Sequence, residues 1–429
     1  MAQDGRLTRR IIGMLSTRIP QLGISKHLTD PRSDRGKQWK LQPLVTAMLA
    51  GLMAGCKNLA EVERLTKELS PATRKRLSIP RRIADTTLRD LAVALSPLEV
   101  CALIRESAQR AVRSKAVEPD GLPLDVVSMD GKTTAVEELD NQFAQTHKDS
   151  DGLGACGLVR TITCTLVSSL AKVCLEVVPM GNKSNEVGFF KTAFEQLYTH
   201  HGSSFDMVTY DAGAYSAANA ELVVSKKKDF LFHLKDDRKF LTQKAVRVLG
   251  KSKNVMAETV DVLCKKDNVR MVRRLYMAEA ATGYKNMKTV RTVLRVQAQK
   301  IDGKGKVLFD EDRYFVSSKL HSKLTPAQWL ELVRRHWAVE VTHNILDVAF
   351  EEDDRPWITH SAQGMLVVLL LRRLAFNLLS LFRSSTLRSD EKRRTPWKTL
   401  FGWVMRALEQ ATEEHLAGLR IRRVSAVCS

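Results

Sequence analysis

The sequence lacks a long apolar segment. Its longest uninterrupted apolar run, residues 365–371, is followed directly by Arg372 and Arg373, whereas a membrane-spanning helix needs about 20 apolar residues. The N-terminal residues contain no continuous apolar stretch followed by small residues, so they lack the pattern of a signal peptide. These two absences predict a soluble, cytoplasmic protein.

Cysteine is also scarce. The seven cysteines form an odd set with no Cys-x-x-Cys pair, which argues against both a disulfide framework and a thiolate zinc site. We therefore expect reduced thiols.

Acidic residues are too few to balance the basic ones. There are 48 Asp and Glu against 68 Lys and Arg, a formal charge of +20, which predicts a polyanionic partner, nucleic acid before an anionic membrane surface. The excess is uneven, because residues 1–117 carry +12, residues 118–230 carry −7 and residues 231–429 carry +15. Clustered carboxylates are needed to hold divalent cations beside a phosphate. The acidic middle segment is therefore a candidate metal-binding region, with a solvated acidic surface as the alternative.

Residues 1–117 contain helical patterns. Residues 41–56 have the apolar pattern of a buried helix, and residues 58–69 are amphipathic. Further helices are predicted to start at Ser70-Pro71 and at Asp85. Short helices with clustered arginines can dock on a DNA groove, although a solvated charged face is the alternative. The candidate DNA-contacting residues of this region are Arg74, Arg76, Arg81, Arg82 and Arg89.

Strand patterns follow from residue 122. Residues 122–129, 158–167 and 172–180 read as consecutive strands, and residues 185–234 then alternate helix, strand, helix, strand. This order predicts an α/β fold with a mixed sheet flanked by helices. Residues 236–325 are basic and β-rich, and Thr325-Pro326 starts a helix predicted to run to about residue 348. The predicted regions are 1–117, 118–235, 236–325 and 326–429.

Three carboxylates stand out. Asp130 and Asp211 each follow a predicted strand, where side chains project into the ligand-binding crevice of an α/β sheet. Glu340 lies between Trp and Val residues on the predicted helix, and a buried glutamate there needs a cationic partner. A divalent metal is one candidate, and an ion pair with Arg335, Arg372 or Arg373 is the other.

The chain resembles the DDE transposases of bacterial insertion sequences over nearly its whole length. The resemblance is carried by the following residues: Asp30-Pro31-Arg32 with Gly36, Met129-Asp130-Gly131-Lys132, Lys183-Ser184-Asn185-Glu186, Tyr210-Asp211-Ala212-Gly213 with Tyr215, the run 230–235, and the run HWAVEVTHNILDVAFEEDDRPW from His336 to Trp357.

The resemblance implies an RNase H-like catalytic core interrupted by the β-rich insertion, and an enzyme of cut-and-paste transposition. Asp130, Asp211 and Glu340 would hold two Mg²⁺ ions, with Mn²⁺ as a substitute, for DNA cleavage and strand transfer. The implied partner is double-stranded DNA, both the terminal inverted repeats and the target. A homodimer would join two transposon ends in a bacterial cytoplasm, at the nucleoid when DNA is bound.

The sequence departs from the Tyr-x-x-Arg-x-x-x-Glu-x-x-x-x-x-x-Lys pattern of the wider group, because Val333, His336 and Asp347 occupy its positions. Phosphate contacts could then come from Arg334, Arg335 or His336, and from Lys132 beside Asp130. The acidic run 351–354 reads as a polar helix end, although Asp347 or Glu351 could replace Glu340 as a ligand. The spacing of seven between His336 and His343 does not fit a zinc pair.

Two further functions stay open. The departure from the pattern is compatible with a catalytically silent DNA-binding protein derived from such an element. An RNase H-like nuclease that acts without strand transfer is the other.

Overall fold

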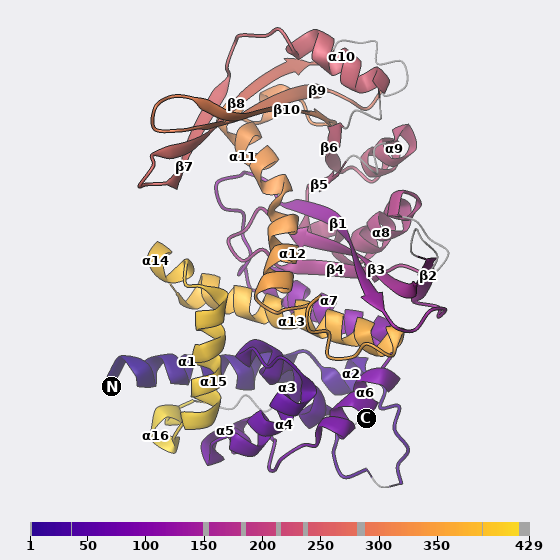
Figure 1. Ribbon diagram of the computed structural model, residues 1–429, viewed down its shortest axis with the longest axis vertical. Coiled ribbons are helices and arrows are strands. Elements are labelled where there is room, and N and C mark those ends of the chain that lie inside the picture. The colour runs from indigo at the N-terminus through magenta and orange to yellow at the C-terminus, as the bar shows by residue number, and fades with distance from the viewer. Residues whose placement is uncertain are drawn as a thin grey trace.

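The computed structural model describes residues 2–35, 37–148, 154–181, 186–211, 216–234, 239–280, 288–387 and 389–419. It is elongated, with a helical region at one end, a central sheet flanked by helices, and four strands that extend the sheet at the other end (Figure 1). The predicted α/β class, the mixed sheet and the helical N-terminal region are confirmed.

The N-terminal region is made of helices only. They are α1 (Ala2–Gln21), α2 (Ile24–His27), α3 (Leu41–Ala54), α4 (Leu59–Glu68), α5 (Pro71–Leu77), α6 (Asp85–Ala94) and α7 (Pro97–Arg113). The predicted starts hold because the local chemistry caps them: Asn58 accepts a hydrogen bond from the Glu61 amide, and Ser70 accepts one from Thr73 with Pro71 at the first helical position.

The central sheet follows the predicted order of three strands and then alternating helices and strands. Its elements are β1 (Val126–Val136), β2 (Ala144–Lys148), β3 (Ala155–Leu166), β4 (Cys174–Pro179), α8 (Glu186–His201), β5 (Met207–Tyr210), α9 (Ala217–Ser225) and β6 (Asp229–Leu234). Strands β4, β3 and β1 pair antiparallel in that order, and β1, β5 and β6 pair parallel. The sheet is therefore mixed, as predicted.

The basic β-rich segment continues this sheet. After α10 (Lys239–Leu249) come β7 (Ala257–Cys264), β8 (Val269–Glu279), β9 (Thr292–Ile301) and β10 (Val307–Ser317), which we call the β arm. Strand β10 pairs antiparallel with β6, so the order runs β6-β10-β9-β8-β7. The sequence patterns missed β2, β7 and α10, because β7 is mostly exposed and β2 is exposed for most of its length.

The helix predicted over residues 325–348 is interrupted. Helix α11 (Pro326–His336) begins with the predicted capping box of Thr325 and Gln328, but it ends at Trp337, and α12 (Ala338–Val348) begins there. Trp337 has φ −80° and ψ 2°, between two helical segments. Its indole packs against Phe315 of β10 and under the Arg313 guanidinium. The helix therefore breaks at Trp337, where the side chain packs against other elements. The apolar periodicity of residues 325–348 did not indicate this break.

The C-terminal helices pack on the N-terminal helices as well as on the sheet. They are α13 (Ala362–Thr386), α14 (Asp390–Arg393), α15 (Trp397–Gln410) and α16 (Glu413–Leu416). Among the described helices, α13 is long and apolar enough to cross a membrane, as is the bent pair α3 and α4 taken together. The apolar part of α13 is, however, wholly buried between the N-terminal helices and the sheet, as in a core helix (Figure 1).

Candidate active site

The three candidate carboxylates come from three elements that meet at one edge of the central sheet. Asp130 lies in β1 and Asp211 directly follows β5, and the last register pair of these parallel strands is Met129 with Tyr210. Asp130 and Asp211 are therefore the next residues on neighbouring strands, which are about 4.8 Å apart. Contrary to the prediction, β1 does not end before Asp130, because its residues 130–136 remain paired with β3 after β5 has ended.

Glu340 of α12 faces these two aspartates. Burial of part of its surface, followed by the negative charges of Asp130 and Asp211, raises the pKa of Glu340 above its ordinary value. Glu340 is nevertheless exposed rather than buried as expected, and the neighbouring carboxylates add to the effect of partial burial on its carboxylate. The structure thus brings the three predicted ligands together.

Two histidines hold the aspartates. His343, one turn beyond Glu340 on α12, places its Nδ1 3.1 Å from an Asp130 oxygen. His233 of β6 places its Nδ1 2.9 Å from an Asp211 oxygen. Because Tyr210 is in register with Phe232, Asp211 and His233 are again next neighbours on parallel strands. The sequence patterns included both histidines in quoted motifs but gave neither a role.

Asp211 and Glu340 line a cavity of about 800 Å³ between the central sheet and the β arm. Its basic wall is made by Arg273, Arg313 and Arg334. Arg273 and Arg334 both pair with Asp261, Arg334 also lies 3.6 Å from Glu331, and Arg313 pairs with Glu311 at 2.8 Å. Arg334 is the only one of the three that the sequence patterns singled out.

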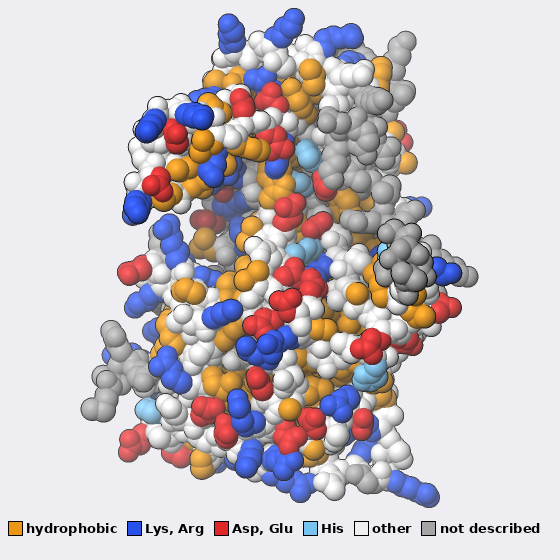
Figure 2. Space-filling model, viewed as in Figure 1, with side chains coloured by type: hydrophobic (Ala, Val, Ile, Leu, Met, Phe, Trp, Pro, Cys, Tyr) orange, Lys and Arg blue, Asp and Glu red, His pale blue; other side chains and the backbone are white. Residues whose placement is uncertain are grey.

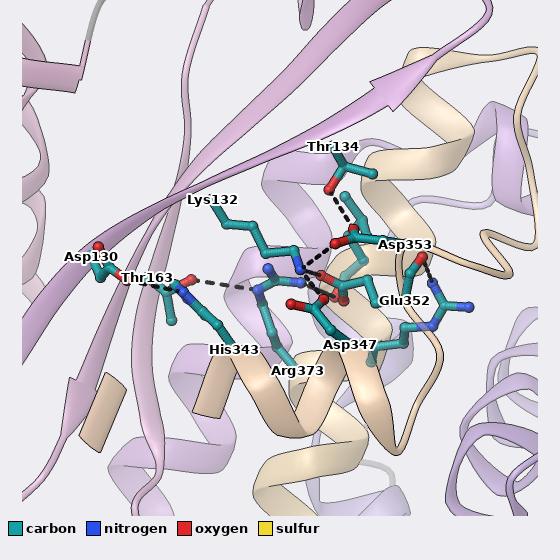
Figure 3. A network of polar contacts seen from close by, with 11 residues as sticks. Asp130, Lys132, Thr134, Thr163, His343, Asp347, Glu352, Asp353 and Arg373 are labelled. Atoms are coloured by element: carbon teal, nitrogen blue, oxygen red, sulfur yellow. Dashed lines mark hydrogen bonds and ion pairs between the residues drawn. The ribbon is translucent and has the colours of Figure 1, made fainter. Parts of the chain in front are cut away.

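Lys132 occupies a second group of carboxylates and does not reach the first. Its ammonium lies 3.5 Å from Glu352, 3.1 Å from Asp353 and in contact with Asp347 (Figure 3). We call these three residues the acidic cluster. Their oxygens lie close enough together to bind a metal ion, but the ammonium already supplies a cation there. Lys132 was expected to contact a scissile phosphate beside Asp130, but its ammonium lies in the acidic cluster instead.

His336 and Arg335 also lie away from the cavity. His336 is 3% exposed and its Nδ1 is 2.5 Å from the Thr209 hydroxyl. Burial, with His233 nearby, lowers the pKa of His336 to about 3, which keeps the ring neutral. Arg335 forms ion pairs with Glu331 at 2.6 Å and Asp120 at 3.7 Å.

The alternative partners proposed for Glu340 are engaged elsewhere. Arg373 pairs with the buried Glu352 at 3.0 Å, and Arg372 donates to the carbonyls of Glu352 and Arg355. Within the described ranges, no ion pair or hydrogen bond of the Glu340 side chain is found. Asp347 and Glu351, the alternative metal ligands, also have partners. Asp347 contacts Lys132, and Glu351 pairs with Arg355 at 3.1 Å.

The five arginines expected to contact DNA from the N-terminal helices have partners within the protein. Arg74 and Arg76 donate to backbone carbonyls, and Arg81 lies over the Trp39 ring. Arg82 pairs with Glu63, and Arg89 pairs with Asp85 at 3.1 Å. Arg81 and Arg82 remain exposed.

Parts of the motifs that carry the resemblance lie outside the described residues. They are residues 36, 183–185, 212–215 and 235.

No protein-family model matches the chain, and no curated protein matches it. Among solved structures, the chain is similar to a piggyBac transposase, seen by cryo-EM in a synaptic complex with hairpin DNA. The identity is 12% and the TM-score 0.39, and the match covers 99% of this chain and 86% of that one.

Proposed function

We propose that the chain is a DNA transposase that cleaves and joins DNA strands with divalent cations held by Asp130, Asp211 and Glu340. One observation carries the proposal: three carboxylates from β1, the end of β5 and α12 meet beside a cavity with an arginine wall. Three neighbouring carboxylates repel one another, and a divalent cation removes that repulsion.

The donor set suits Mg²⁺ or Mn²⁺, because both prefer carboxylate oxygens. When bound, such ions activate an attacking hydroxyl and stabilise the leaving oxygen in phosphoryl transfer. The chain's own residues do the positioning. His343 and His233 hold Asp130 and Asp211 in place. Arg313 lies over the Trp337 ring, pairs with Glu311 at 2.8 Å and is the cation that acts on Glu340.

The finer parts of the proposal are terminal inverted repeats as the bound DNA, a homodimer that pairs two ends, and a bacterial cytoplasmic location. The departures at Val333, His336 and Asp347 favour a second function, a DNA-binding protein without catalysis. Against it, the three carboxylates are intact and the two histidines orient two of them.

The test is DNA cleavage with Mg²⁺ or Mn²⁺, together with binding measured in a chelator. Asp130→Asn, Asp211→Asn and Glu340→Gln should each keep DNA binding and lose cleavage by more than the roughly 10–100-fold typical of groups that only support a ligand. Asp354→Asn, at an exposed carboxylate outside the site, is the matched control and should cleave normally.

The outcomes separate the candidate functions. Wild-type binding without cleavage at any metal concentration would establish the silent DNA-binding protein. Cleavage without joined products in a plasmid target would establish a nuclease that does not transfer strands.

A further inference from the structure

A second cavity with arginines in its wall shares no lining residue with the one beside the three carboxylates. It has a volume of about 600 Å³ and is enclosed by α1, the end of α7 and the end of α13. We call it the arginine cavity, because Arg10 and Arg18 of α1 and Arg110 and Arg113 of α7 line it. None of its lining residues is acidic.

The four guanidinium groups are only partly neutralised. Arg110 and Arg113 share one carboxylate, Glu106, at 2.6 and 3.3 Å. Across the described part of the chain, neither Arg10 nor Arg18 has an ion pair or a side-chain hydrogen bond. The arrangement therefore leaves an excess of positive charge around a concave surface.

Arg18 is half-buried, and this burial lowers its pKa. A guanidinium that loses water without gaining an acceptor destabilises the folded protein. An anion in the cavity would supply acceptors, and the Thr17 and Thr386 hydroxyls and the Gln21 amide at its wall are further donors. Planar arginine groups suit the oxygens of a phosphate, which they bind through paired hydrogen bonds.

We propose that the arginine cavity binds a backbone phosphate of DNA, at a site separate from the candidate active site. The choice of DNA as the source of the phosphate rests on the proposed function. The site is additional to the predicted DNA contacts of Arg74, Arg76, Arg81, Arg82 and Arg89, which stay a prediction. A contact of this kind fixes the position of the duplex without reading its sequence.

The experiment measures duplex binding by fluorescence anisotropy in a chelator over a series of salt concentrations. The variant Arg10→Gln/Arg18→Gln should reduce the slope of log affinity against log salt by about 1, since the cavity binds one phosphate and each phosphate contact contributes about 0.9. Affinity should fall roughly 10- to 100-fold at about 0.1 M salt, equally for every duplex sequence. Arg6→Gln/Arg9→Gln, on the same helix but outside the cavity lining, is the control and should keep the wild-type slope.

Arg113→Gln gives a second test in case the double variant does not fold, with an expected slope change of about 1. An unchanged slope in a folded cavity variant, or an equal change in the control, would overturn the proposal. So would lost binding to phosphatidylserine vesicles with an unchanged DNA slope, which would assign the cavity to a lipid headgroup.

Failure of the proposed function has a different signature. If the wild type binds DNA but does not cleave it, the proposed transposase activity is wrong. The salt dependence of binding still tests the proposal for the arginine cavity. If the wild type does not bind DNA, both are wrong.

Discussion

At the scale of single residues, two charged side chains that lie close together on β1 have different surroundings and different roles. Asp130 faces Glu340 and His343, whereas Lys132, two residues further along β1, points its ammonium into the acidic cluster (Figure 3). The lysine side chain is 7% exposed and Glu352 is 0% exposed. Lys132 therefore fastens β1 to the segment after α12, the helix that carries Glu340.

Lys132→Met should lower the free energy of unfolding by about 3 kcal/mol, because it removes the cation from a partly buried group of three carboxylates. Lys57→Met is the control, since Lys57 is 45% exposed and lies 3.8 Å from Glu351; it should cost less than about 1 kcal/mol. Urea denaturation measures both. Normal stability with lost DNA cleavage would instead return Lys132 to the role of a phosphate contact.

At the scale of elements, a buried polar cluster joins the N-terminal helices to the central sheet. Glu176 of β4 is fully buried and accepts from Arg105 of α7 at 3.3 Å and His200 of α8 at 2.8 Å. Burial raises the pKa of Glu176 to about 8, with Arg105 opposing the change. Burial also lowers the pKa of the neighbouring His201 to about 4, aided by the positive charges of His200 and Arg105.

These two pKa changes act on stability in different pH ranges. A raised carboxyl pKa stabilises the folded state below the ordinary value of 4.5, and that contribution is lost as the pH rises towards 8. The lowered pKa of His201 contributes stability above 6.5 that is lost as the pH falls towards 4. Between pH 6.5 and 8, only the Glu176 contribution of these two declines.

We therefore expect Glu176→Gln to remove a fall in the free energy of unfolding between pH 6.5 and 8. Urea denaturation at several pH values compares the variant with the wild type. Parallel pH profiles for the two proteins would mean that Glu176 stays ionised when folded.

At the scale of the whole molecule, the helical ends of the chain share one hydrophobic core. Buried residues of α1 to α7 pack with those of α13, α15 and α16, and α13 lies between the N-terminal helices and the sheet (Figure 1). On the face seen in Figure 2, Lys and Arg side chains follow the β arm and acidic side chains gather towards the middle. The predicted region 1–117 is thus helical and shares its core with the C-terminal helices.

Expressed alone, residues 1–117 should show no cooperative thermal unfolding by circular dichroism, because the partners of their apolar surface lie in residues 346–416. Co-expression with residues 326–429 should restore part of that cooperativity. The intact chain, measured under the same conditions, is the reference. A sharp transition in the isolated fragment would show that it is an independent domain.

The sequence by itself determined most of the order of helices and strands, the helix starts at Asn58, Ser70 and Thr325, and the choice of three candidate carboxylates. Caps, strand patterns and polar residues at strand ends are local signals, whereas β2, β7 and α10 were missed. The tertiary structure alone decided which charges face one another. It placed Lys132 in the acidic cluster, broke the helix at Trp337 and joined the β arm to β6. Pairing of charges and strands depends on residues far apart in sequence, and no local pattern reports such distances.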